Sequence, residues 1–435
     1  MKINESFENF YNKIHLEDCT EYNSAIKNIT KKLNEFYYDD SEYEDVEQDH
    51  CHIVGSIGRG TAIVGVSDVD MLFELPESIY ERYDAYTFNG QSALLQDIKK
   101  VLLERYPRTD IKGDGQAVVI EFNKFSIDLV PAFLNYDNSF RYPDTNDGGS
   151  WKNTNPYPEQ EKSSQINSLS NNNFVSLANM MRDWKDNAGF VFGGLLIDTL
   201  VYKFLCQNTK YWNSGFDEYD DIIQSLLKYL SEQDKDTKIY ALGSSQEIVD
   251  KGKGSYILFA DEMYQALLNA QDENEQESVF ITMFGKAFEE SIVDSSRKTL
   301  LEAHYCLYNC TNTEEFIEDK FPVHIKYHLA INCRVTADGW RPMLLKFMKV
   351  LPIKRKLEFF IEEINVPKPY KIYWKVRNVG ATAMAKNCIR GQIFEGKETK
   401  KESSDFNGPH YVECYIVKNN ICVARRRLPV NIEES

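Results

Sequence analysis

The stretch that decides the fold runs from Cys51 to Leu75 and reads CHIVGSIGRGTAIVGVSDVDMLFEL. An apolar run leads into the Gly55-Ser56 turn, a glycine-bearing loop follows, and an alternating strand then carries Asp68 and Asp70. Because side chains alternate along a strand, the two acids point to the same face. Like charges held close together repel and raise each other's pKa. The pair therefore predicts a cationic partner, and hard carboxylate oxygens suit a divalent ion such as magnesium.

A third acid, Asp128, lies in the segment 117–133, which reads AVVIEFNKFSIDLVPAF. This segment predicts a hairpin of strands 118–122 and 125–130 that turns at Asn123-Lys124. An unpaired charge in so apolar a strand is costly, and a metal would offset the cost. Three carboxylates on neighbouring strands can hold two Mg²⁺ ions roughly 3.5–4 Å apart, as two-metal phosphoryl transfer needs. The Gly55-Ser56 turn offers backbone amides and a hydroxyl to a triphosphate.

These motifs together resemble a known superfamily. Gly55-Ser56, Asp68-x-Asp70 and the run from Asp128 to Phe133 (DLVPAF) resemble the polymerase-beta-type nucleotidyltransferases. Within that superfamily they are most similar to the bacterial cyclic-oligonucleotide synthases of anti-phage signalling, which are relatives of cyclic GMP-AMP synthase. The resemblance implies an α+β fold, with a nucleotidyltransferase lobe and N-terminal helix over 1–165, a helical nucleotide-binding lobe over 166–318 and a C-terminal β sensor domain over 319–435.

The resemblance also implies roles for individual residues. Asp68, Asp70 and Asp128 would be the catalytic and metal-binding acids, with two Mg²⁺ ions, or Mn²⁺ as the alternative. The residues implied to bind the nucleotide are Gly55, Ser56, Arg59, Thr61 and Lys185.

The role assigned to Lys185 depends more on the resemblance than that of any other residue. This lysine follows a helical face of Phe174, Leu177, Met180, Met181 and Trp184, and the residues alone favour a solvated lysine there. The resemblance instead implies contact with the incoming triphosphate. Where the family often has a serine before the next helix, this chain has Gly193-Gly194. That hydroxyl contact is therefore in doubt, although amides at the start of a helix over 195–204 could replace it.

Composition limits the partners. The chain has 435 residues, a net charge of -17 and a pI near 5.0, which argues against a large nucleic-acid footprint. Its nine cysteines show no Cys-x-x-Cys spacing and predict free thiols in a reducing cytosol. No apolar run reaches transmembrane length and no signal-peptide core is present, so we expect a cytoplasmic protein without a membrane partner.

Periodicity predicts the remaining elements. Helical patterns cover residues 1–38, 92–105 and most of 168–309, including a helix over 291–308, and the spacing of Cys306 and Cys310 places these two cysteines on one helical face. The polar stretch 134–165 predicts a loop, with an ordered portion from Trp151 to Pro158. Beyond Asp319 the pattern alternates from Ile325 onward, and strands are expected over 357–361, 370–376, 410–416 and 421–425. This region predicts a β-sandwich or a partly open barrel.

The C-terminal segment has its own resemblance. Its stretches 369–378, 390–391 and 410–415 look like the sensor domain shared by adenylyl/guanylyl cyclases and these synthases. Trp374, Tyr411 and Arg390 could form a stacking and phosphate-pairing pocket for a trigger or nucleotide. The equally weighted alternative is that Trp374 lies in the hydrophobic core and that Arg390 caps a loop. The run of arginines 425–427 suits either a solvated strand end or a ligand site.

The function that these residues imply is a template-independent nucleotidyltransferase. It would join NTPs, with ATP and GTP as candidates, into a cyclic di- or trinucleotide second messenger. Two alternatives remain: an enzyme that attaches AMP to a protein or RNA end, and a non-catalytic nucleotide receptor. The helical lobe and sensor domain count against the first alternative, and the intact acid triad counts against the second.

Overall fold

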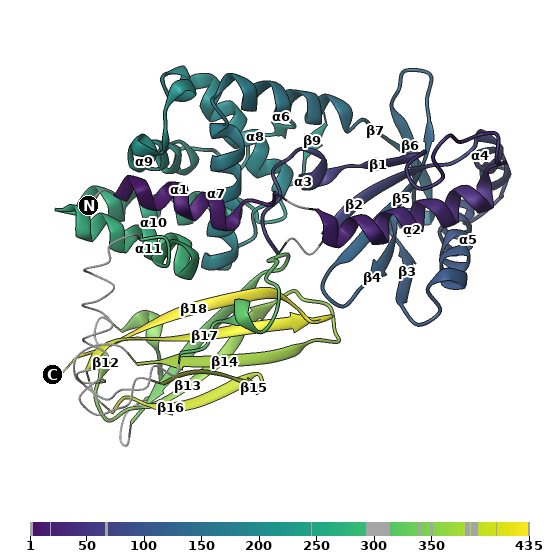
Figure 1. Ribbon diagram of the computed structural model, residues 1–435. Coiled ribbons are helices and arrows are strands. Elements are labelled where there is room, and N and C mark those ends of the chain that lie inside the picture. Colours follow the sequence, from purple (N-terminus) through teal and green to yellow (C-terminus); the bar gives the residue numbers. More distant parts are fainter. Residues whose placement is uncertain are drawn as a thin grey trace.

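The computed structural model describes residues 3–17, 19–65, 68–244, 246–292, 314–337, 341–348, 351–378, 383, 390–405 and 407–433. They form a sheet lobe, a helical lobe and a C-terminal β-domain (Figure 1). This arrangement confirms the predicted α+β class. The helix expected over 291–308 falls almost wholly outside the described residues, as do Cys306 and Cys310. Within the described part of the chain, no helix is both long and apolar enough to cross a membrane.

The sheet lobe is built on a mixed sheet of strand order β1-β2-β5-β4-β3, and β6 continues it from β5 to β7. Its strands are β1 (Cys51–Ile53), β2 (Asp68–Glu74), β3 (Asp110–Asp114), β4 (Ala117–Glu121), β5 (Ser126–Leu134), β6 (Phe140–Asp144) and β7 (Ser150–Thr154). Helices α2 (Thr20–Tyr37) and α5 (Gly90–Arg105) share its core, and α4 (Glu77–Asp84) packs beside α5. The predicted β4–β5 hairpin and the helix at α5 are confirmed.

The hairpin β6–β7 corrects the loop expected over 134–165. Polar residues dominate this stretch, but Phe140 is buried and continues the register of β5 through its pairing with Leu134. The Trp151 ring packs against Tyr80 and Phe133, with ring centroids 5.0 and 5.7 Å away. A few well-placed aromatic side chains thus order a segment whose overall composition is typical of a loop.

The N-terminal region with a helical pattern forms two helices, and each packs against a different lobe. Helix α1 (Ile3–Ile14) buries Phe7 and Phe10 in the core of the helical lobe. Helix α2 begins at Thr20 and packs Ile29 and Leu33 against the sheet. The expectation that the N-terminal helix belongs to the nucleotidyltransferase lobe therefore holds for α2 and is wrong for α1. The chain joins the two lobes at the break between these helices.

The helical lobe contains α1 together with the helices that follow the sheet. They are α6 (Tyr157–Leu169), α7 (Asn173–Ala188), α8 (Gly194–Gln207), α9 (Tyr219–Ser231), α10 (Ser255–Asn269) and α11 (Glu273–Glu289), with the short strands β8 (Ile239–Tyr240) and β9 (Glu247–Ile248) between α9 and α10. Helix α7 is buried along most of its length, as expected of the spine of a lobe. The predicted apolar face from Phe174 to Trp184 lies inside this core.

The β-domain is a sandwich of two sheets, in the orders β11-β10-β13-β16 and β12-β18-β17-β14-β15. Its strands are β10 (Leu329–Thr336), β11 (Met343–Leu344), β12 (Leu351–Pro352), β13 (Lys356–Ile364), β14 (Lys371–Arg377), β15 (Arg390–Gly396), β16 (Thr399–Ser403), β17 (Gly408–Lys418) and β18 (Ile421–Glu433). The β17–β18 hairpin turns at Asn419-Asn420, where both residues have positive φ, as a tight hairpin turn requires.

A strap joins the helical lobe to this sandwich. The alternating pattern from Ile325 predicted a strand, but β10 begins only at Leu329, and residues 322–328, here called the strap, run along β18. The strap bonds to β18 through the amides of His324 and Lys326, which donate to the carbonyls of Cys422 and Val423 at 2.9 and 3.0 Å. Strand β18 lies on the side of the sandwich that faces the two lobes (Figure 1).

Candidate functional site

The three predicted acids lie together on adjacent parallel strands. Asp70 on β2 is the register partner of Asp128 on β5, and Asp68 precedes Asp70 by two residues on the same face. Burial raises the pKa of Asp70 above its ordinary value, and the negative charge of Asp68 raises it further. The same two causes, in the same order, raise the pKa of Asp128 to about 7. These two half-buried carboxylates therefore lack sufficient compensating charge from the protein.

The chemistry of these acids fits divalent cations, although their side chains are not arranged as a closed site. No group of three or more His, Cys, Asp or Glu side chains among the described residues is placed to hold a metal. Asp68 instead forms an ion pair with Lys326 of the strap. Hard oxygen donors that repel one another in a buried position are nevertheless the ligands Mg²⁺ and Mn²⁺ prefer. Asp68, Asp70 and Asp128 are the residues that would hold the ions.

The Gly55-Ser56 turn lies directly against the acids. Strand β1 ends at Ile53, and the single turn α3 (Gly55–Gly58) follows it. Gly55 has φ 64°, and a Cβ atom at this position would collide with the Asp70 carboxylate. Only glycine combines this left-handed conformation with so close an approach. The turn predicted from the sequence is thus fixed in contact with Asp70.

Arg59 and Thr61 take part in a different arrangement from the one expected. Arg59 donates from Nε to Asp198 Oδ2 at 2.8 Å, and the Thr61 hydroxyl donates to the same oxygen at 3.0 Å. Arg182 on α7 pairs with Asp198 at 2.7 Å. Burial would raise the pKa of Asp198, but the two guanidinium groups hold it below its ordinary value. In this structure both side chains fasten the loop after α3 to the helical lobe, and nucleotide contact by Arg59 and Thr61 remains a prediction.

Lys185 lies near the end of α7 and is buried rather than solvated. Its Nζ is 2.6 Å from Asp186 Oδ1, and the same oxygen accepts a hydrogen bond from the backbone amide of Ile325 in the strap. Burial lowers the pKa of the strap's His324 to about 4, and the charges of Asp68, Lys185 and Asp186 all act on it. The strap therefore passes between Lys185 and the acids. Triphosphate contact by Lys185 remains a prediction.

Two functional candidates escaped the reading of the sequence. Lys326 Nζ forms an ion pair with Asp68 Oδ2, and His324 Nε2 lies 3.4 Å from the same oxygen. The Ser126 hydroxyl donates to Asp68 Oδ1 at 3.1 Å. The available signal was the run His324-Ile-Lys326-Tyr-His328, in which basic residues alternate within a strongly acidic chain. Nothing in that run indicates that its partner is an aspartate more than 250 positions earlier.

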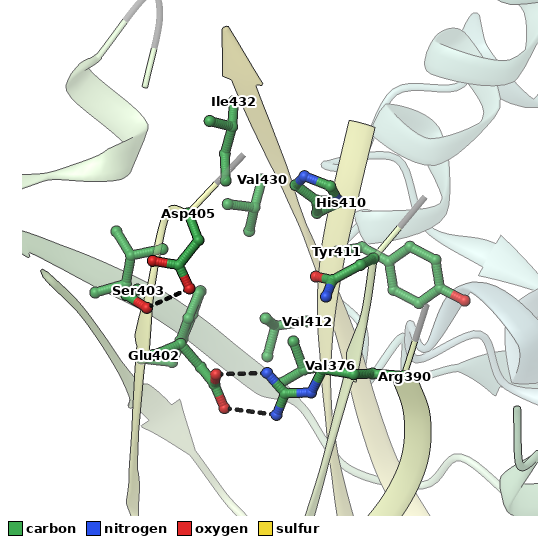
Figure 2. A pocket seen from close by; sticks show the side chains of 13 residues that line it. Val376, Arg390, Glu402, Ser403, Asp405, His410, Tyr411, Val412, Val430 and Ile432 are labelled. Carbon is green, nitrogen blue, oxygen red and sulfur yellow. Dashed lines mark hydrogen bonds and ion pairs between the residues drawn. The ribbon is translucent and has the colours of Figure 1, made fainter. Parts of the chain in front are cut away.

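The β-domain holds a cavity between its two sheets (Figure 2). Val376, Val412, Val430 and Ile432 form part of its apolar lining, and Arg390 pairs with Glu402 at its edge through two contacts of 2.7 and 3.0 Å. The Tyr411 ring points away from Val430 and Ile432.

The predicted trio of Trp374, Tyr411 and Arg390 does not form one pocket. Trp374 is buried in the sandwich core and donates to the carbonyl of Lys397 at 2.8 Å. The Tyr411 hydroxyl donates to Glu314 at 2.9 Å. Arg425, the first of the three successive arginines, is likewise buried and paired with Glu413 and Glu318, so a solvated strand end is excluded for it.

Comparison with known proteins agrees with this architecture. Residues 1–167 match the Second Messenger Oligonucleotide or Dinucleotide Synthetase domain (SMODS), and residues 311–433 match the Adenylyl/Guanylyl and SMODS C-terminal sensor domain. The chain therefore carries a SMODS domain followed by the matching C-terminal sensor domain, the two domains that its motifs indicated.

Individual relatives are distant. A probable cyclic nucleotide synthase of Bacillus cereus is 27% identical over 199 residues, which cover 38% of this chain and 60% of the relative. The structure of E. coli MS115-1 CdnC with ATP is similar at a TM-score of 0.50 and 15% identity, over 66% of this chain and 99% of that one. The structure of Bradyrhizobium diazoefficiens CdnG in complex with GTP has a TM-score of 0.48 at 10% identity, and the match covers 66% of this chain and 97% of CdnG. The CdnC structure supports the fold assignment.

Proposed function

We propose that this protein is a cytosolic, metal-dependent nucleotidyltransferase that joins NTPs into a cyclic di- or trinucleotide second messenger of anti-phage defence. The observation that carries the proposal is the set of three half-buried acids on β2 and β5 with the Gly55-Ser56 turn against Asp70. The domain matches, SMODS followed by its C-terminal sensor domain, support it. The free thiols of Cys51, Cys206, Cys333, Cys414 and Cys422 suit a reducing cytosol.

Each group has a defined task in this mechanism. Asp68, Asp70 and Asp128 bind two Mg²⁺ or Mn²⁺ ions, which when bound polarise the phosphates and lower the pKa of the acceptor hydroxyl. The Gly55 amide and the Ser56 hydroxyl hold the β- and γ-phosphates, and Lys185 adds positive charge. Asp128, which would help hold the second ion, takes part in removing the proton of the acceptor ribose hydroxyl. The hydroxyl oxygen attacks the α-phosphorus in line, the bond to the β-phosphate oxygen breaks, and pyrophosphate leaves.

ATP and GTP are the first substrates to consider. The similar CdnC structure was determined with ATP, and the CdnG structure with GTP. The acidic surface of the chain does not favour a long nucleic-acid acceptor. The β-domain would bind a trigger or nucleotide, in keeping with the description of its family as a sensor domain.

The test is incubation of the purified protein with Mg²⁺ or Mn²⁺ and all four labelled NTPs. We expect a product that phosphatase cannot shorten, because a ring has no terminal phosphate. Asp70→Asn and Asp128→Asn should abolish it while the protein stays folded. Asp110→Asn, at an exposed acid on β3, is the matched control. Full activity in both site variants would reject the assignment. Label on a protein or RNA end would favour the AMP-transfer alternative, and binding without turnover would favour a receptor.

A further inference from the structure

The strap is anchored to the β-domain along its length. In addition to the bonds from His324 and Lys326, the amide of Cys422 donates back to the carbonyl of Pro322 at 2.8 Å. Val323 and Cys422 pair as neighbouring parallel residues. The strap therefore behaves as a short extra strand on the edge of β18, and it must follow β18 when the β-domain moves.

The side chains and backbone of the strap engage the proposed nucleotide site on both sides. Lys326 reaches Asp68 on the sheet lobe through its ammonium group. The Ile325 amide donates at 3.0 Å to Asp186, which is the ion-pair partner of Lys185 on the helical lobe. One segment of the sensor domain thus occupies the groups that would bind the metal and the triphosphate.

We propose that the strap is a built-in inhibitor of the enzyme, in which the Lys326 ammonium takes the place on Asp68 that a divalent cation needs. The inference rests on the proposed function, because Asp68 is a metal ligand only in that mechanism. Lysine is suited to the task, since it carries a compact charge on a flexible stem. A single carboxylate oxygen cannot contact both the ammonium and a metal ion at full strength, so the two cations compete. Metal and NTP bind after the strap withdraws.

Contacts between the β-domain and the lobes are of a kind that can be released. The Arg426 guanidinium lies 5.2 Å from the centre of the Phe259 ring on α10. Asn419, at the tip of the β17–β18 hairpin, donates to Glu121 on β4 at 2.8 Å, and this contact is exposed.

An acid on α7 lies where charges from both sides of the contact act on it. Asp183 has a side-chain oxygen, Oδ2, without a hydrogen-bond partner among the described residues. Burial, and then the charges of Asp186 and Glu318, raises its pKa well above the ordinary value, while Arg425 on β18 acts in the opposite direction. A ligand that shifts β18 needs to supply only the free-energy difference between the docked and withdrawn states.

Binding of Mn²⁺ alone to the full-length protein tests the proposal, with free Mn²⁺ measured by electron paramagnetic resonance. Lys326→Met removes the competing charge and should tighten Mn²⁺ binding by roughly two- to fivefold, as expected for loss of an ion pair that water reaches. Lys371→Met is the matched control, because this lysine lies in the same domain and pairs with Glu395. It should leave Mn²⁺ affinity unchanged. Asp68→Asn should weaken binding, and if it does not, the metal assignment itself fails.

A second measurement uses the unaltered protein. Acylation of Lys326, followed by mass spectrometry, should be slow in the free protein and at least several-fold faster with Mn²⁺ and a non-hydrolysable NTP. Lys371 should react equally in both conditions. Unchanged or weaker Mn²⁺ binding by a folded Lys326→Met variant would overturn the inhibitor assignment. So would equal Lys326 reactivity with and without Mn²⁺ and the NTP analogue.

Discussion

Gly55→Ala tests whether the contact between the turn and Asp70 is needed for catalysis. At φ 64° an alanine costs about 1–2 kcal/mol relative to glycine, because its Cβ crowds the following carbonyl oxygen. In addition, the new Cβ would overlap the Asp70 carboxylate. The overlap extends from the carboxylate to the Asp70 Cβ at 2.8 Å, so the whole Asp70 side chain must shift. A displacement of a reacting group by about 1 Å can reduce the rate on the order of a hundredfold.

Gly60→Ala is the matched control for this prediction. Gly60 has φ 70°, nearly the same conformation, but no atom lies within 4 Å of a Cβ built there. In urea titrations Gly60→Ala should therefore lose roughly 1–2 kcal/mol of unfolding free energy, and Gly55→Ala at least as much, because of the added overlap with Asp70. Only Gly55→Ala should lose about a hundredfold in product formation from labelled NTPs at saturating metal. If the two folded variants retained equal activity, the turn would not be positioning Asp70.

Three further predictions concern charged groups. Asp198→Asn leaves two guanidinium groups buried without their partner and should cost about 3–5 kcal/mol in calorimetry; a loss under 1 kcal/mol would contradict it. Cations around the buried Glu413 hold its pKa below the ordinary 4.5, so its contribution to stability is present above that pH and is lost as the pH falls through and below it. Glu413→Gln should be less stable at pH 7 and should flatten this acid dependence; an unchanged pH profile would refute it. Lys185→Met should weaken NTP binding roughly tenfold, and unaltered affinity in a filter assay would remove Lys185 from the site.

Sequence alone predicted the part of the site that local rules determine. The alternation of side chains along a strand places Asp68 and Asp70 on one face, and the apolar neighbours of Asp128 indicate a buried strand. The Gly55-Ser56 turn could be recognised because the left-handed position requires glycine. These features depend on a few adjacent residues, which is why they survive comparison with the structure.

The partners of charged side chains could not be predicted in the same way. The family resemblance implies that Arg59 binds the nucleotide, but its partner in the structure, Asp198, lies 139 positions further along the chain. That pairing depends on how the two lobes meet. The β6–β7 hairpin was missed for a related reason, since Trp151 becomes ordered only through packing on Tyr80 and Phe133.

The two charged contacts in this region have different energetic consequences. Arg59 and Asp198 have side chains only 8% and 0% exposed, so separating them would leave buried charges unpaired, and the contact serves as a permanent fastening between the lobes. Lys326 is 37% exposed, and ion pairs that water reaches contribute typically about 0–1 kcal/mol. Lys326 can therefore leave Asp68 at small cost, because water will solvate the released ammonium and a metal ion will replace it at the carboxylate. The exposure of the lysine, more than the strength of its contact, makes the strap suitable as a reversible inhibitor.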